Sequence, residues 1–127
     1  MQNKKGQTGI GESFQLAFRG FGIALSSERN FQIHLVCTAV VVALILILGT
    51  SIVETMILVV VISLILSMEL INTSMERLID IIEPSMNSKI KEVKDMLASA
   101  VLVSSMGALI IGIFVFVPKI FEILRAF

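Results

Sequence analysis

The most informative part of this chain runs from Thr55 to Glu83 and reads TMILVVVISLILSMELINTSMERLIDIIE. Its first half contains no charged residue, whereas its second half carries acids and small polar residues at helical spacing: Glu69, Asn72, Thr73, Glu76, Asp80 and Glu83. On an α-helix these side chains fall on one side, and the aliphatic residues between them fall on the other. The segment therefore predicts a membrane helix whose acidic stripe begins inside the bilayer and continues into water.

The composition of the whole chain agrees with a membrane protein. Of its 127 residues, 56% are hydrophobic and only 16% are charged, against roughly 25% charged residues in an average soluble domain. The formal net charge is zero, so there is no basic excess to neutralise nucleic-acid phosphates. The single cysteine, Cys37, excludes an intrachain disulfide and a cysteine-based zinc cluster. The length fits a single domain, residues 1–127.

Three runs without charged residues set the organisation of that domain: 30–53, 55–68 and 96–118. A membrane-spanning helix needs about 20 mostly apolar residues, so the second run spans only if its helix continues through Glu69. The residue before a proline disfavours helical geometry, which ends this helix at Glu83-Pro84. We therefore expect an all-α fold with membrane helices at 31–49, 52–82 and 97–117, the second leaving the bilayer near residue 75.

The first 29 residues differ from the rest. Residues 1–11 are polar and contain glycines, so we expect a mobile N-terminus. Residues 12–27 then place four apolar side chains on one helical face, Phe14, Phe18, Phe21 and Leu25. This pattern predicts an amphipathic helix lying in the membrane interface, with an ordinary helix packed on the bundle as the alternative.

The distribution of Lys and Arg predicts the orientation in the membrane. The N-terminal segment and the second loop, 77–95, contain most of these residues, and the first loop, 49–54, contains none. Cytoplasmic loops carry the excess of positive charge. We therefore expect the N-terminus and the second loop in the cytoplasm, and the first loop and the C-terminus outside.

Carboxylates within a membrane helix are costly and mark functional sites by default. Magnesium is held by one or two carboxylates together with water and substrate phosphates, which suits Glu76 and also Glu28 just before the first span. Lys94 could meet a phosphate, and Asp95 could orient Lys94 or a nucleotide hydroxyl. Three simpler interpretations remain. The stripe could hold helices together through polar contacts, Lys94-Asp95 could be an ordinary helix start, and His34 could be a structural histidine.

These residues resemble the signature of the prokaryotic diacylglycerol kinases, which include the undecaprenol kinases. The resemblance rests on Glu69-Leu-Ile-Asn72-Thr73-Ser-Met-Glu76, followed by Lys94-Asp95-Met96, and extends over about residues 13–117. Glu28-Arg29-Asn30-Phe31-Gln32 is similar to the family's Gram-positive branch. Three features depart from the usual pattern: Val93 precedes the Lys-Asp pair, Leu97-Ala98-Ser99 follows Met96, and the loop at 83–92 differs. We therefore assign no nucleotide contact to residues 83–92.

The resemblance implies a homotrimer of three-helix protomers, each with an N-terminal surface helix, in the bacterial plasma membrane. It also implies transfer of the γ-phosphoryl group of MgATP to a lipid hydroxyl. Glu69 corresponds to the general base, where the lipid substrate binds, and Glu28 and Glu76 to metal-binding acids. The nucleotide and catalytic region of the family contains Asn72, Lys94 and Asp95. The residues that correspond to ATP binding are Glu28, Glu76, Lys94 and Asp95. The acceptor stays open between undecaprenol, which we favour, and diacylglycerol.

A different class of function also fits an acidic stripe. A small channel or transport subunit could use the carboxylates as a cation path without catalysis. Such a protein has no need of Lys94-Asp95 or of MgATP, so phosphorylation of a lipid extract with labelled ATP separates the two classes.

Overall fold

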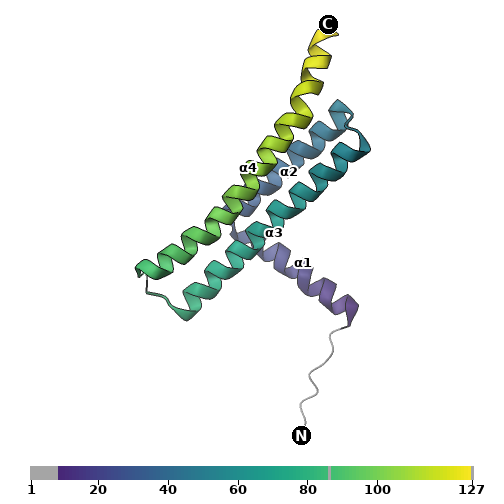
Figure 1. Ribbon diagram of the computed structural model, residues 1–127. Helices are drawn as coiled ribbons and strands as arrows, with labels where there is room; N and C mark the ends of the chain where they lie inside the picture. The colour runs from purple at the N-terminus through teal and green to yellow at the C-terminus, as the bar shows by residue number, and fades with distance from the viewer. Residues whose placement is uncertain (1–8, 86, 127) are drawn as a thin grey trace.

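The computed structural model describes residues 9–85 and 87–126. It consists of four helices: α1 (Ile10–Ser27), α2 (Arg29–Leu48), α3 (Ile52–Ile82) and α4 (Ser88–Arg125). In Figure 1, α2, α3 and α4 form an antiparallel bundle, and α1 leaves it at an angle. Most of the expected mobile segment, with Lys4 and Lys5 of the orientation argument, lies outside the described residues.

Helices α2, α3 and α4 are each long and apolar enough to cross a membrane. At 1.5 Å per residue, α3 is about 46 Å long and α4 about 57 Å, against about 30 Å for the hydrocarbon core. Both therefore extend beyond the bilayer. The helix that contains the expected span 97–117 begins at Ser88 and continues through Pro118 to Arg125.

Local sequence signals explain where the helices end. Helix α2 stops at Gly49, whose φ of 62° lies in the left-handed region that glycine tolerates best. Ser51 and Glu54 then form a capping box that starts α3. At the far end of α3, Glu83 precedes Pro84, and Asn87 caps α4 by accepting a hydrogen bond from the N–H of Ile90 at 3.0 Å.

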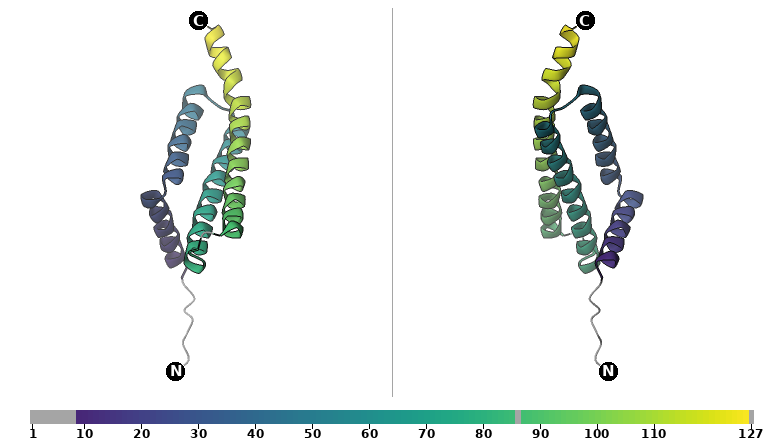
Figure 2. Two further views of the ribbon diagram at one scale, coloured as in Figure 1. Left: turned by 90° about the vertical axis from the view of Figure 1, so that its left-hand side faces the viewer. Right: turned by 90° about the vertical axis from the view of Figure 1, so that its right-hand side faces the viewer.

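The bundle has two layers, with α1 and α2 in one and α3 and α4 in the other (Figure 2). Within the first layer, α1 packs against the start of α2. There the rings of Phe21 and Phe31 make an edge-to-face contact with centroids 5.1 Å apart, a favoured aromatic geometry. Phe31 is fully buried, so it fixes the angle at which α1 leaves the bundle.

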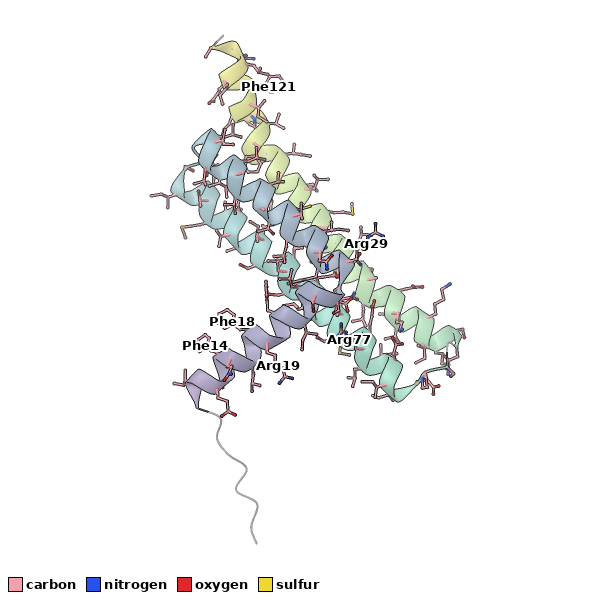
Figure 3. All side chains as sticks on the ribbon, turned by 180° about the vertical axis from the view of Figure 1, so that it is seen from behind. Phe14, Phe18, Arg19, Arg29, Arg77 and Phe121 are labelled. Atoms are coloured by element: carbon pink, nitrogen blue, oxygen red, sulfur yellow. The ribbon has the colours of Figure 1, made fainter. Side chains whose placement is uncertain are left out.

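Burial in this protein is the reverse of that in a soluble domain. The buried residues include Glu69, Asn72 and Thr73, whereas most large aliphatic side chains of the three long helices are exposed. Figure 3 shows Phe14 and Phe18 on one side of α1 and Arg19 on the other. Apolar side chains facing outward are stable against lipid tails or another protein chain, and this pattern agrees with a multi-pass membrane protein.

Candidate functional site

The centre of the candidate site is the buried part of the polar stripe on α3. Glu69, Asn72 and Thr73 are 3%, 7% and 8% exposed. The Glu69 carboxylate interacts electrostatically with His34, Glu76 and Glu28, although Glu28 comes from the α1–α2 junction. The fold thus leaves Glu28 and Glu76, the acids assigned to metal binding, within electrostatic range of Glu69.

Asn72 links the buried part of this stripe to its more exposed part. Its side-chain Nδ2 donates a hydrogen bond to Glu76 Oε1 over 3.2 Å, the i to i+4 spacing of neighbouring side chains on one helical face. Its Oδ1 atom is buried and has no hydrogen-bond partner within the described residues. A buried acceptor without a partner costs free energy and is a natural contact for a ligand or water.

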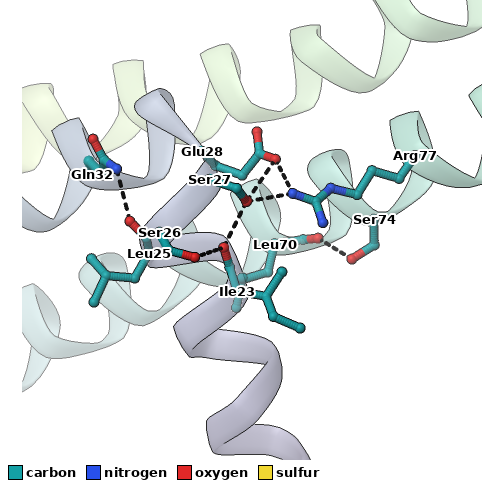
Figure 4. Close-up of polar contacts among 9 residues, drawn as sticks. All are labelled: Ile23, Leu25, Ser26, Ser27, Glu28, Gln32, Leu70, Ser74 and Arg77. Carbon is teal, nitrogen blue, oxygen red and sulfur yellow. Dashed lines mark hydrogen bonds and ion pairs between the residues drawn. The ribbon is translucent and has the colours of Figure 1, made fainter.

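Glu28 lies between the last turn of α1 and the first turn of α2. Its extended backbone, with φ −112° and ψ 109°, interrupts the helix and turns its side chain toward α3. There Arg77 Nη2 donates hydrogen bonds to Glu28 Oε1 and, over 2.6 Å, to Ser27 Oγ (Figure 4). Ser27 Oγ in turn donates to the carbonyl of Ile23 over 2.7 Å. We call Glu28, Glu69, Asn72, Glu76 and Arg77 the polar cluster.

Lys94 and Asp95 take different places. The Lys94 ammonium forms an ion pair with Asp80, one turn beyond Glu76 on α3. Asp95 lies on the wall of an open groove on α4, with Ser88, Lys91, Glu92, Met96 and Ser99. The structure therefore connects Lys94 to the acidic stripe but places Asp95 on a separate surface of the protomer.

The remaining acid of the stripe, Glu83, serves the loop between α3 and α4. Hydrogen bonds from the Ser85 hydroxyl and backbone N–H lower the pKa of the Glu83 carboxyl from its ordinary value. These bonds favour the ionised form and hold the loop next to Pro84. Glu83 therefore has a local structural partner that Glu69 lacks.

The oxygen donors of the polar cluster suit magnesium in kind. Two carboxylates, Glu28 and Glu76, together with the orphaned Asn72 Oδ1, are hard ligands of the sort Mg²⁺ prefers. In the described part of the chain, however, no three His, Cys, Asp or Glu side chains are grouped closely enough to hold a metal by themselves. Such a partial ligand set fits an ion that arrives with its own water and phosphate ligands.

An apolar cavity of about 460 Å³ lies among α2, α3 and α4. His34 and Ile65 are among its lining residues, and its walls continue along the helices to Leu58 and Phe116. His34 also interacts with Glu69. The cavity and the buried acid therefore have His34 as a common neighbour.

The sequence interpretation missed two residues. It treated His34 as structural, yet His34 lines the cavity and also interacts with Glu69. A polar side chain within an otherwise apolar span was the available signal. It assigned no role to Arg77, whose contact with Glu28 joins residues 49 positions apart. A basic residue inside an acidic stripe could have indicated a charge partner nearby.

The geometry defines an integral membrane protein with a carboxylate-rich site near one end of its bundle. Residues 15–116 match the family model of prokaryotic diacylglycerol kinase. The chain therefore belongs to the prokaryotic diacylglycerol kinase family, and it is a lipid kinase, an enzyme that phosphorylates an alcohol.

Two curated relatives agree with this assignment. An undecaprenol kinase of Bacillus subtilis is 36% identical over 109 residues, which cover 86% of this chain and 89% of that protein. A diacylglycerol kinase of Synechocystis is 28% identical over 113 residues, which cover 88% of this chain but only 65% of that protein. No solved structure matches the chain significantly.

Proposed function

We propose that this protein transfers the γ-phosphoryl group of ATP to the hydroxyl of a membrane lipid alcohol, and that its preferred acceptor is undecaprenol. The observation that carries the proposal is the polar cluster, in which a buried acid on a membrane helix lies within electrostatic range of two acids nearer the end of the bundle. A lipid alcohol reaches such an acid from the bilayer, and a nucleotide reaches the other acids from water.

Glu69 is the general base of the proposed reaction. Its carboxylate accepts the proton of the lipid hydroxyl while the hydroxyl oxygen bonds to the γ-phosphorus of ATP. The bond between that phosphorus and the β–γ bridging oxygen breaks, and ADP leaves with the electron pair. Glu69 is 3% exposed, so water competes poorly with the lipid for this base. Asn72, Lys94 and Asp95 complete the proposed catalytic set.

Glu28 and Glu76 hold the magnesium that accompanies ATP in this proposal. Bound magnesium supplies positive charge against the phosphate oxygens during transfer. Glu76 lies about 10 Å along α3 from Glu69, seven residues at 1.5 Å each. In the proposal, the base lies in the bilayer and the metal ligands lie toward the cytoplasm. Lys94 and Asp95 contact ATP, with the second loop and the N-terminus on the cytoplasmic side.

A homotrimer is the proposed assembly, in the bacterial plasma membrane. In this proposal, α1 lies along the membrane interface. Most large aliphatic side chains of the bundle are exposed in the single protomer. Asp95 lies apart from the polar cluster in one protomer. In the proposed trimer, neighbouring protomers would complete the site with residues such as Asp95.

The proposed acceptor rests on two observations. The relative of which the match covers 89% is named an undecaprenol kinase, and the cavity that His34 lines has largely apolar walls along three helices. A single long hydrocarbon chain can follow such a wall while its hydroxyl stays near Glu69.

Purified protein in mixed micelles tests the proposal directly. Undecaprenol and diacylglycerol are presented separately at equal mole fraction with labelled ATP and Mg²⁺, and kcat/KM is measured for each. We expect labelled lipid with both and a higher kcat/KM with undecaprenol, and none when EDTA removes Mg²⁺. A higher value with diacylglycerol overturns the proposed acceptor, and no labelled lipid in either case overturns the proposed function.

A further inference from the structure

Arg77 occupies an unusual position for a basic side chain. It follows Glu76 directly on α3, yet its guanidinium reaches back to the α1–α2 junction. There one nitrogen, Nη2, contacts both Glu28 Oε1 and Ser27 Oγ (Figure 4). Arg77 is thus the basic member of a cluster that otherwise contains acids and an amide.

Neither Lys94 nor Arg29 forms an ion pair with Glu28 within the described residues. Lys94 forms its ion pair with Asp80. Arg29, although adjacent to Glu28, forms no ion pair within residues 9–85 and 87–126. Arg77 therefore supplies the contacting positive charge for Glu28, whose carboxylate is also within electrostatic range of Glu69.

The contact leaves Glu28 with a conflict. The Oε1 atom that accepts from Arg77 is one of the two oxygens with which Glu28 would bind a divalent cation. Arginine cannot be deprotonated in proteins, so its charge repels any cation that approaches while it stays in place. Arg77 is 46% exposed on its side chain, and this exposed, flexible stem has room to move into solvent.

We propose that Arg77 is a positioning residue that exchanges partners: it holds the Glu28 carboxylate in the nucleotide-free protein, and it moves to phosphate oxygens of the nucleotide when a divalent cation takes Glu28. This inference rests on the proposed function. The planar guanidinium suits both partners, because carboxylates and phosphates accept paired hydrogen bonds from it with similar geometry. The exchange keeps every charge matched throughout binding.

The proposal predicts opposite changes in two affinities when the Arg77 charge is removed. Without Arg77, Glu28 is free for a cation, so cation binding to the nucleotide-free protein tightens. The nucleotide loses a phosphate contact, so its binding weakens. A residue that only fastened the α1–α2 junction to α3 would weaken both when replaced.

The first measurement is Mn²⁺ binding to the full-length, nucleotide-free protein in detergent, by electron paramagnetic resonance of free Mn²⁺. We expect Arg77→Gln to bind Mn²⁺ roughly two- to fivefold more tightly, the scale of a partly exposed ion pair. Arg29→Gln removes the same charge beside Glu28 without removing a contact, and its effect is expected to be smaller. Arg77→Lys keeps the charge but loses the planar fork, and we expect its Mn²⁺ affinity between those of wild type and Arg77→Gln.

The second measurement is binding of a fluorescent, non-hydrolysable ATP analogue with Mg²⁺. We expect roughly ten- to hundredfold weaker binding in Arg77→Gln, the range of a charged hydrogen bond, and a smaller loss in Arg77→Lys. Unchanged or weaker Mn²⁺ binding in Arg77→Gln overturns the proposal, and so does unchanged nucleotide binding. If the Arg77 effects are present but wild type phosphorylates no lipid, the proposed function fails and the partner exchange stands.

Discussion

The two ends of the bundle each carry an ion pair between helices, but the two pairs have different surroundings. At one end Glu54 of α3 pairs with Lys119 of α4 over 3.1 Å. At the other end Glu28 pairs with Arg77. We call the first the capped end, defined by Ser51, Glu54 and Lys119, and compare it with the polar cluster.

At the capped end the acid has a complete set of local partners. The Glu54 carboxylate accepts a hydrogen bond from the Ser51 N–H at 2.6 Å as well as contacting Lys119. The Glu54 N–H in turn donates to Ser51 Oγ at 3.3 Å. These are the contacts of a helix start, and they account for Glu54 without any ligand.

The polar cluster lacks such a complete set of partners within the described residues. Asn72 Oδ1 is buried and unpaired in the described part of the chain, and Glu69 forms no ion pair there. Polar groups left unpaired in a membrane helix lower stability, so their presence indicates a use other than holding the fold. An acid with satisfied partners is structural, whereas an acid beside unsatisfied groups is a candidate for binding and catalysis.

The largest effect is expected from Glu69→Gln. This change keeps the shape of the side chain and removes the proposed base, so turnover should fall by about 10²- to 10⁴-fold. Folding should survive because the change removes a charge that is 3% exposed and lacks an ion-pair partner. The measurement is kcat with saturating lipid and MgATP, together with elution volume and nucleotide affinity.

Glu54→Gln is the matched control, since it makes the same change at the capped end of the same helix. Its turnover should stay within about twofold of wild type, as expected of a surface change away from the site. A Glu69→Gln enzyme that kept more than about a tenth of wild-type turnover, a barrier change below roughly 1.4 kcal/mol, would remove Glu69 from the role of base. The two ends of the bundle would then no longer differ in their role in catalysis.

The next effect concerns magnesium at the polar cluster. Glu28→Gln and Glu76→Gln each remove one of two proposed carboxylate ligands, so the Mg²⁺ concentration for half-maximal activity should rise by roughly tenfold in each. A magnesium titration at fixed ATP measures this. Glu54→Gln should titrate like wild type, and normal titrations in both cluster variants would contradict the assignment of metal ligands.

The sequence was sufficient for the spans and for the stripe, because both depend on local order along the chain. Three runs without charge predicted α2, α3 and α4 as membrane helices, and helical periodicity placed Glu69, Asn72 and Glu76 on one face. The end of α4 could not be predicted in this way. A hydropathy pattern marks where a helix is apolar, whereas α4 continues past both limits of its apolar run.

The pairing of charges across helices could not be predicted from the sequence. Glu28 meets Arg77 across 49 positions, and Lys94 meets Asp80 rather than Glu28 or Glu76. Such contacts depend on how far α3 is rotated and shifted against its neighbours. No periodicity in a single sequence fixes that rotation and shift.

The smallest effect is expected on the stability of variants at the capped end. These variants distinguish the contribution of the helix cap from that of the ion pair. Glu54→Gln keeps a capping-box residue, because Gln can also accept from the Ser51 N–H, but it loses the charge that pairs with Lys119. Glu54→Ala loses both. Loss of the ion pair alone should lower stability less than loss of the ion pair and the helix cap together. Thermal unfolding in detergent should therefore rank wild type above Glu54→Gln and Glu54→Gln above Glu54→Ala, with Lys119→Met close to Glu54→Gln.

All three variants should keep wild-type Mg²⁺ dependence, since Glu54 and Lys119 contact no member of the polar cluster. A capped-end variant with an altered magnesium titration would show that the two ends are coupled, and the division into a structural end and a functional end would be wrong.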